Sequence, residues 1–209
     1  METMRSVKKL IIVLLALTVS QKTFAQNHQD LIKAFSTSYD LEAKKEYGKA
    51  FETLQKVYSE NSYEINLRMG WLAYLNNQQE VSLKYYKKAM ELMPYAIEPC
   101  FGYAFPAAAL NKWDDVLNIY DKILSIDPNN TIASYRKGLI LYNRGDFGAA
   151  EKMFEKVVNL YPFDYDGLIM LAWTKFKMGK NQEAKVLFQK TLLNRPGDKS
   201  AAEGLELVK

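Results

Sequence analysis

Residues 131–162 read TIASYRKGLILYNRGDFGAAEKMFEKVVNLYP, and their spacing of small, bulky and turn residues recurs on both sides of this stretch. The last residue of the stretch is a proline that belongs to a series in which neighbouring members lie 34 residues apart. The series consists of Pro94, Pro128, Pro162 and Pro196. A spacing this regular predicts a repeated structural element.

Other positions keep a fixed distance from these prolines. The residue 24 positions earlier is always small, and the residue eight positions earlier is always aromatic. The small residues are Gly70, Ala104, Gly138 and Ala172, and the aromatic residues are Tyr86, Tyr120, Phe154 and Phe188. A small side chain lets two helices approach closely, and Gly145 and Gly179 supply the positive φ that ends a helix. Because proline has no N–H, it ends the second helix, so each repeat is predicted to be helix, turn, helix.

This pattern resembles the tetratricopeptide repeat, a helical hairpin of 34 residues. In the central repeat the signature places are occupied by Gly138, Leu141, Gly145, Phe147, Ala150, Phe154, Val157 and Pro162. The resemblance implies an all-α fold, a right-handed superhelical solenoid. It covers five repeats, at residues 31–62, 63–96, 97–130, 131–164 and 165–198.

The first 25 residues have the composition of a secretory signal peptide. Basic residues precede an apolar run, LIIVLLALTV at residues 10–19, and small residues precede Gln26. Ten residues span only about 15 Å as a helix, roughly half of a bilayer core, so a stable transmembrane anchor is the weaker interpretation. We therefore expect residues 1–25 to be removed and the mature chain to be exported, periplasmic or secreted.

Two short segments flank the predicted repeats. Residues 26–30 form an amino-terminal segment without a recognisable cap. Beyond the last repeat, Ser200 with Glu203 three residues later predicts a capping box that starts a carboxy-terminal capping helix within residues 199–209. Such a helix would cover the apolar end of the solenoid.

Charge and composition exclude several functions. Without residues 1–25 the chain has 24 basic and 23 acidic residues, so no basic surface for nucleic acid is expected. The only histidine is His28 and the only cysteine is Cys100, which we expect to be buried. No Cys/His pair, metal-ligand spacing or phosphate-binding glycine loop is present. We therefore expect neither a catalytic site nor a metal or cofactor; an enzyme would have to work with carboxylates alone.

The resemblance implies which residues face a partner, because in this family the first helix of each repeat lines a concave face. The predicted partner-binding groove consists of Phe35, Tyr39, Leu67, Trp71, Tyr74, Phe101, Phe105, Tyr135, Leu139, Tyr142, Ile169, Trp173 and Phe176. Glu64, Glu98 and Asp166 lie at its edge. The cation set with which some members clamp a carboxylate is missing, since Arg68 and Arg136 are the only nearby cations. We therefore expect an apolar ligand surface.

Three explanations for this aromatic stripe stay open, because soluble monomers rarely leave so large an apolar surface bare. A partner protein could lay a helix or an extended segment into it. Tight curvature could instead pack the ninth-position aromatics of adjacent repeats on one another, which would make the stripe partly core. The third explanation is self-association into a homo-oligomer, or the carriage of a small apolar ligand. We favour a non-enzymatic protein–protein interaction scaffold, and we expect Pro106 to kink its helix near Phe105.

Overall fold

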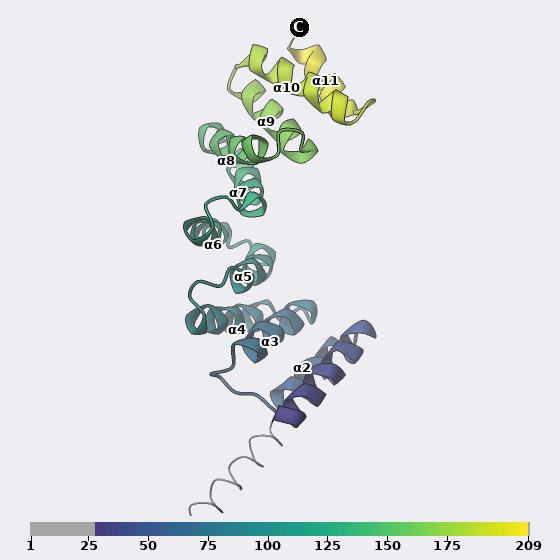
Figure 1. Cartoon of the computed structure of the whole chain (residues 1–209), viewed down its shortest axis with the longest axis vertical. Helices are drawn as coiled ribbons and strands as arrows, with labels where there is room; N and C mark the ends of the chain where they lie inside the picture. The colour runs from purple at the N-terminus through teal and green to yellow at the C-terminus, as the bar shows by residue number, and fades with distance from the viewer. Residues whose placement is uncertain (1–27, 209) are drawn as a thin grey trace, which may run out of the picture. The chain divides into compact units, whose positions relative to one another are not determined.

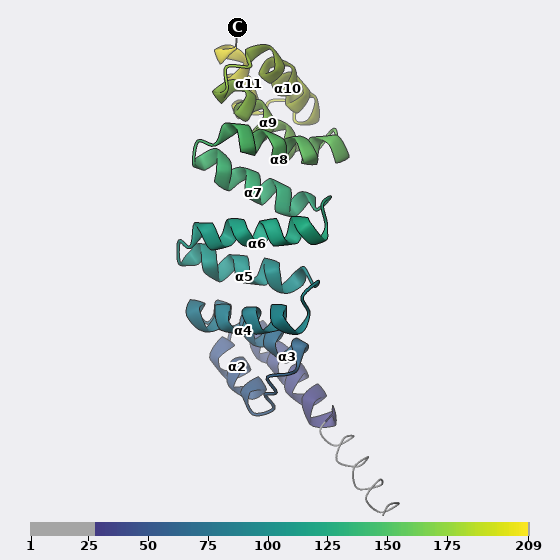
Figure 2. The same ribbon diagram turned by 90° about the vertical axis from the view of Figure 1, so that its left-hand side faces the viewer.

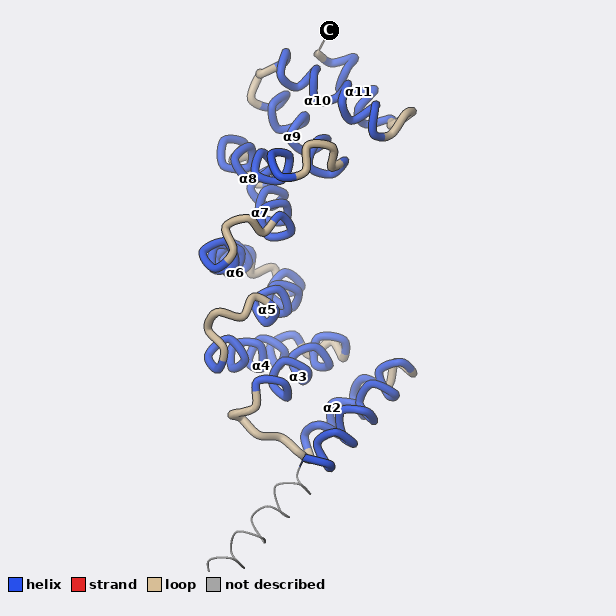
Figure 3. The backbone as a smooth tube through the Cα atoms, viewed as in Figure 1, coloured by secondary structure: helices blue, strands red, loops and turns tan. Residues whose placement is uncertain are grey.

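The structure, a computed structural model, describes residues 28–208 of the chain. All regular secondary structure in this range is helical, and no strand occurs there (Figure 3). The predicted all-α fold is therefore confirmed. The predicted signal peptide, residues 1–25, lies outside the described residues. Within residues 28–208, no helix combines the length and the apolar character that crossing a bilayer requires.

The helices form two compact units, an amino-terminal unit that ends at Leu92 and a carboxy-terminal unit that begins at Met93. The amino-terminal unit contains the helical residues 28–43, α2 (Tyr47–Gln55), α3 (Tyr63–Leu75) and α4 (Gln79–Leu92). The carboxy-terminal unit contains α5 (Glu98–Ala109), α6 (Trp113–Ile126), α7 (Thr131–Asn143), α8 (Phe147–Leu160), α9 (Tyr165–Lys177), α10 (Asn181–Asn194) and α11 (Lys199–Leu207). In Figure 2, α5 to α8 stack in chain order.

Each helix pair is joined by a turn with one residue in the left-handed conformation. Gly145 and Gly179, the predicted turn glycines, have φ values of 79° and 74°. The corresponding turns of the earlier pairs use Lys45, Asn77 and Asn111, with φ values of 61°, 60° and 57°. Asparagine tolerates this conformation better than most side chains do, so it replaces glycine at two of the turns.

The small residues of the repeat lie where an aromatic ring of the second helix meets the backbone of the first. A Cβ atom on Gly138 would lie 2.7 Å from the Phe154 ring, and one on Gly70 would lie 3.0 Å from the Tyr86 ring. Both rings are buried. The close approach of the two helices that the sequence predicts at these positions is therefore confirmed.

The start of α11 differs from the predicted capping box. Asp198 is the N-cap, and its carboxylate accepts a hydrogen bond of 2.8 Å from the Ala201 amide. The helix therefore begins with Lys199, earlier than a cap at Ser200 would allow. Ser200 lies inside the first turn, where its hydroxyl accepts a hydrogen bond from the Trp173 indole instead. The prediction of Ser200 as the cap was wrong because Asp198 is also a strong N-cap residue and lies earlier in the chain.

Helix α5 contains two residues that the sequence makes unusual. Pro106 is buried, and α5 continues past it to Ala109, so the predicted kink stays a prediction. Cys100 is fully buried, as expected. Burial raises the pKa of its thiol, which keeps the group in its unreactive protonated form.

Candidate functional site

The residues of the predicted groove lie on the first helices of the helix pairs. Phe35 and Tyr39 lie in the helical residues 28–43, Leu67, Trp71 and Tyr74 on α3, Phe101 and Phe105 on α5, Tyr135, Leu139 and Tyr142 on α7, and Ile169, Trp173 and Phe176 on α9. In the carboxy-terminal unit, α5 and α7 lie along one side, and α6 and α8 lie along the other (Figure 1).

The exposure of these side chains is intermediate for most of them. Tyr39 is 55% exposed and Phe105 is 39% exposed, whereas Ile169 is buried. The other ten are half-buried. The aromatic stripe, as we call these thirteen residues, is therefore neither a bare surface nor a closed core in either unit.

In the amino-terminal unit the stripe covers a buried arginine. The Arg68 guanidinium forms an ion pair with Glu42, and its Nε donates to the Ser38 hydroxyl over 3.2 Å. The Tyr39 ring lies over this guanidinium, with 3.9 Å from Cζ to the ring centroid. The Trp71 indole donates to the same Glu42 carboxylate over 2.7 Å. These contacts fix the orientation of both stripe rings, and they place Arg68 beneath the stripe rather than on it.

In the carboxy-terminal unit the stripe rings pack on their own second helices and on the capping helix. The Trp173 ring lies 5.0 Å from the Phe188 ring of α10, and its indole donates to Ser200 of α11 over 2.9 Å. Tyr135 meets the Phe154 ring of α8 at 5.8 Å. Trp173 and Tyr135 are both half-buried, so these rings pack against the core and remain partly accessible.

Arg136, the second cation near the stripe, is also engaged. Its guanidinium lies 5.7 Å from the Phe101 ring centroid and 5.4 Å from that of Phe105. The two arginines thus both lie near stripe rings, Arg68 at Tyr39 and Arg136 at Phe101 and Phe105. A guanidinium that lies near aromatic rings in this way is compatible with an apolar binding surface.

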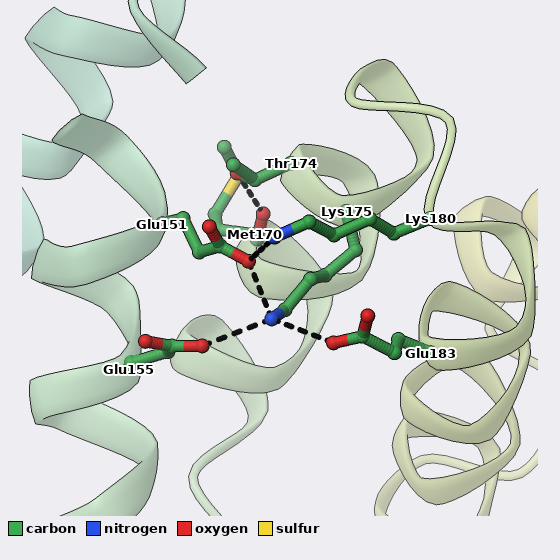
Figure 4. A network of polar contacts seen from close by, with 7 residues as sticks. All are labelled: Glu151, Glu155, Met170, Thr174, Lys175, Lys180 and Glu183. Carbon is green, nitrogen blue, oxygen red and sulfur yellow. Dashed lines mark hydrogen bonds and ion pairs between the residues drawn. The ribbon is translucent and has the colours of Figure 1, made fainter. Parts of the chain in front are cut away.

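A network around Lys175 was not predicted from the sequence (Figure 4). Lys175 of α9 is buried, and its ammonium contacts Glu151, Glu155 at 2.9 Å and Glu183 at 2.8 Å. Lys180 also binds Glu151, over 2.6 Å. The network therefore joins α8, α9 and α10. A signal existed in the pair Glu151 and Glu155, which share one helical face, but their partners lie on other helices and depend on packing.

The Lys175 network shifts the proton affinities of its members. Burial alone would lower the pKa of Lys175, but hydrogen bonds to the three glutamates outweigh burial and raise that pKa above its ordinary value. Burial would raise the pKa of Glu151, but the hydrogen bonds from Lys175 and Lys180 hold that pKa below its ordinary value. Both groups are thus held in their charged forms.

Within residues 28–208 no group of three or more His, Cys, Asp or Glu could hold a metal ion.

Sequence comparisons agree with this architecture. Residues 141–206 match the family model described as tetratricopeptide repeat. The TPR repeat-containing protein MJ1428 of Methanocaldococcus jannaschii is 32% identical over 117 residues, which cover 51% of this chain and 20% of that protein. MJ0263 of the same organism is 42% identical over 57 residues, or 27% of this chain and 18% of that protein. The chain spans about a fifth of the length of these curated relatives.

Solved structures share the fold. A tetratricopeptide repeat protein from Parabacteroides merdae superposes with a TM-score of 0.74 at 20% identity, over 86% of this chain and 72% of that chain. MamA gives a TM-score of 0.71 at 16% identity, over 80% and 92% of the two chains. YrrB, described as a TPR protein with an unusual peptide-binding site, gives 0.70 at 16% identity, over 89% and 97%.

The fold is an α-helical repeat fold, and repeat folds of this kind commonly present surfaces for protein–protein interaction. Residues 141–206 of the chain match the tetratricopeptide repeat, the repeat that the sequence predicted, and the solved structures share its fold.

Proposed function

We propose that this chain is a non-enzymatic scaffold that binds a peptide or a helix of a partner protein along its aromatic stripe. The observation that carries this proposal is the partial exposure of stripe rings that contact side chains of their own unit. Tyr39 lies over the buried Arg68 in the amino-terminal unit, and Phe105 lies near Arg136 in the carboxy-terminal unit. Aromatic side chains that are already fixed lose little conformational entropy on binding, and for that reason they make good anchors.

The charges around the stripe favour an apolar ligand face. Tyr39 covers Arg68, and the rings of Phe101 and Phe105 face Arg136. An amphipathic helix satisfies such a surface, because it buries an apolar row and leaves its polar side in water. YrrB, which shares the fold, is itself described by a peptide-binding site.

The test uses the two exposed stripe residues. The two tryptophans are less suitable, because Trp71 and Trp173 hold Glu42 and Ser200 through their indoles and their loss would disturb the fold. The full chain and a Tyr39→Ser, Phe105→Ser variant would be used to capture partners from cell-envelope extract, with mass spectrometry of the retained proteins. We expect a partner that the wild type retains and the variant releases.

Trp113→Ser is the matched control. Trp113 is 41% exposed, close to the 39% of Phe105, but it lies on α6, along the other side of the carboxy-terminal unit. Thermal unfolding of all three proteins would check that they are folded. A partner that the double variant retains, or that only Trp113→Ser releases, would contradict the proposal.

We also propose that the chain is exported and acts in the periplasm or outside the cell. Support comes from the charged and apolar pattern of residues 1–25 alone. Amino-terminal sequencing of the protein from fractionated cells should give Gln26 as the first residue, and Leu14→Asp should retain the precursor in the cytoplasm. An intact amino-terminus on exported protein would contradict cleavage, and protein found only in the cytoplasm would contradict export.

A further inference from the structure

The carboxy-terminal unit has a pocket at the start of α7, beside the loop between α8 and α9. Its volume is about 490 Å³, and the residues that matter for its chemistry are Ile132, Tyr135, Arg136, Tyr161, Asp164 and Asp166. Tyr135 belongs to the aromatic stripe, so the pocket opens beside the surface to which a partner is proposed to bind.

The pocket has an aromatic and aliphatic rim. Ile132 and Tyr161 are exposed, and Tyr135 is half-buried with its ring against Phe154. Two tyrosine rings at one pocket offer π-faces as well as apolar surface. Such faces attract a cation that leaves water to reach them.

Two carboxylates at the start of α9 form no ion pair with a cation of residues 28–208. One oxygen of Asp164 caps the helix by accepting the Gly167 amide over 2.7 Å, and its other oxygen has no hydrogen bond within residues 28–208. The exposed Asp166 carboxylate has neither a hydrogen bond nor an ion pair with any described residue. The acid at the corresponding place of the second repeat, Glu64, differs, because the Ser62 hydroxyl donates to it over 2.9 Å.

Arg136, the cation among these pocket residues, lies near aromatic rings of α5. The Arg136 guanidinium lies near the Phe101 and Phe105 rings of α5, whereas the two aspartates belong to α9. Burial raises the pKa of Tyr135, and the charges of Asp166 and Asp164 raise it further. The two carboxylates are therefore close enough to Tyr135 to influence its hydroxyl, which stays protonated.

We propose that this pocket receives a basic side chain, arginine or lysine, of the partner segment that lies on the aromatic stripe. The proposal rests on the proposed function and adds a charge requirement to it. An arginine guanidinium is the better occupant of the two, because it can stack on a tyrosine ring while it donates two N–H groups to a carboxylate. We therefore expect the partner segment to carry one basic residue next to a row of apolar residues.

The test uses a small probe and the full chain labelled with ¹⁵N. N-acetyl-arginine amide would be titrated and followed by NMR, with N-acetyl-citrulline amide as the neutral probe of the same shape. We expect arginine-dependent shifts at residues 131–136 and 164–167. Asp164→Asn with Asp166→Asn should weaken binding roughly tenfold, as expected for lost charge-assisted hydrogen bonds, while asparagine still caps α9.

Asp146→Asn is the matched control, because Asp146 caps α8 in the same way, over 3.1 Å to the Ala149 amide. It should bind the probe as the wild type does. Three outcomes would each overturn the proposed role of the pocket. They are equal binding of the arginine and citrulline probes, shifts confined to other residues, and unchanged binding in the Asp164→Asn, Asp166→Asn variant. Release of the captured partner by Tyr39→Ser, Phe105→Ser reports on the stripe separately, so the two proposals can fail independently.

Discussion

The two units each bury one cation on a first helix, but they satisfy it differently. Lys175 meets three carboxylates, from α8 and α10, and every contact joins it to another helix. Arg68 meets one carboxylate, one hydroxyl and one ring, and its buried Nη2 has no hydrogen-bond partner in the described part of the chain. The same kind of helical repeat thus holds a fully paired cation at Lys175 and an incompletely paired one at Arg68. The complete network should contribute more to stability.

The largest expected effect follows from removing the centre of the complete network. Lys175→Met leaves the partly buried Glu151 carboxylate with only Lys180, and removing the buried partner of an ion pair in this way costs about 3 kcal/mol. Hydrogen exchange of the α8, α9 and α10 amides would measure the loss within the carboxy-terminal unit. Lys177→Met, at an exposed position of the same helix, should change little. Equal effects of the two variants would show that the Lys175 network does not stabilise the carboxy-terminal unit.

A smaller loss is expected at Arg68. Arg68→Met removes the ion pair with Glu42, but it also removes an N–H group that is buried without a partner. Glu42 is partly exposed and keeps the hydrogen bond from Trp71, so we expect a loss of about 1 kcal/mol. Exchange of the α3 amides is the measurement. A loss as large as that of Lys175→Met would remove the contrast between the two units.

Acid should weaken the carboxy-terminal network. The pKa of Glu151 is lowered in the folded chain, so its contribution to stability is present above its ordinary value of 4.5 and is lost as the pH falls through the lowered pKa. The pKa of Lys175 is raised, so its contribution would be lost only in strong alkali. Unfolding between pH 7 and pH 3 should therefore show a smaller loss of stability in Glu151→Gln than in the wild type. Parallel curves for the two proteins would contradict this explanation.

The repeat spacing predicted the parts of the fold that depend on one helix pair. Gly138 and Phe154 belong to the same hairpin, so their close approach follows from sequence positions alone. The turn at Asn111 was not singled out, because asparagine is a weaker signal for positive φ than glycine is. The start of α11 was misplaced because Asp198 and Ser200 are both good caps two residues apart.

The parts that could not be predicted depend on how neighbouring helices align. The partners of Lys175 come from α8 and α10, and Arg68 reaches residues of the helical segment 28–43. Composition alone does not decide which charges meet, because that requires the packing of helices against each other. The same limit applies to the stripe: the sequence placed its residues on the first helices, but not the covering of Arg68 by Tyr39.

The central claim, that a partner protein contacts the aromatic stripe, can be tested by photocrosslinking in living cells. The photoreactive residue p-benzoylphenylalanine would replace Phe105 in one strain and Trp113 in another, since the two side chains are similarly exposed on different helices. We predict that the chain with the probe at position 105 forms a covalent adduct with a partner protein and that the chain with the probe at 113 does not. Adducts from position 113 alone would contradict the claim.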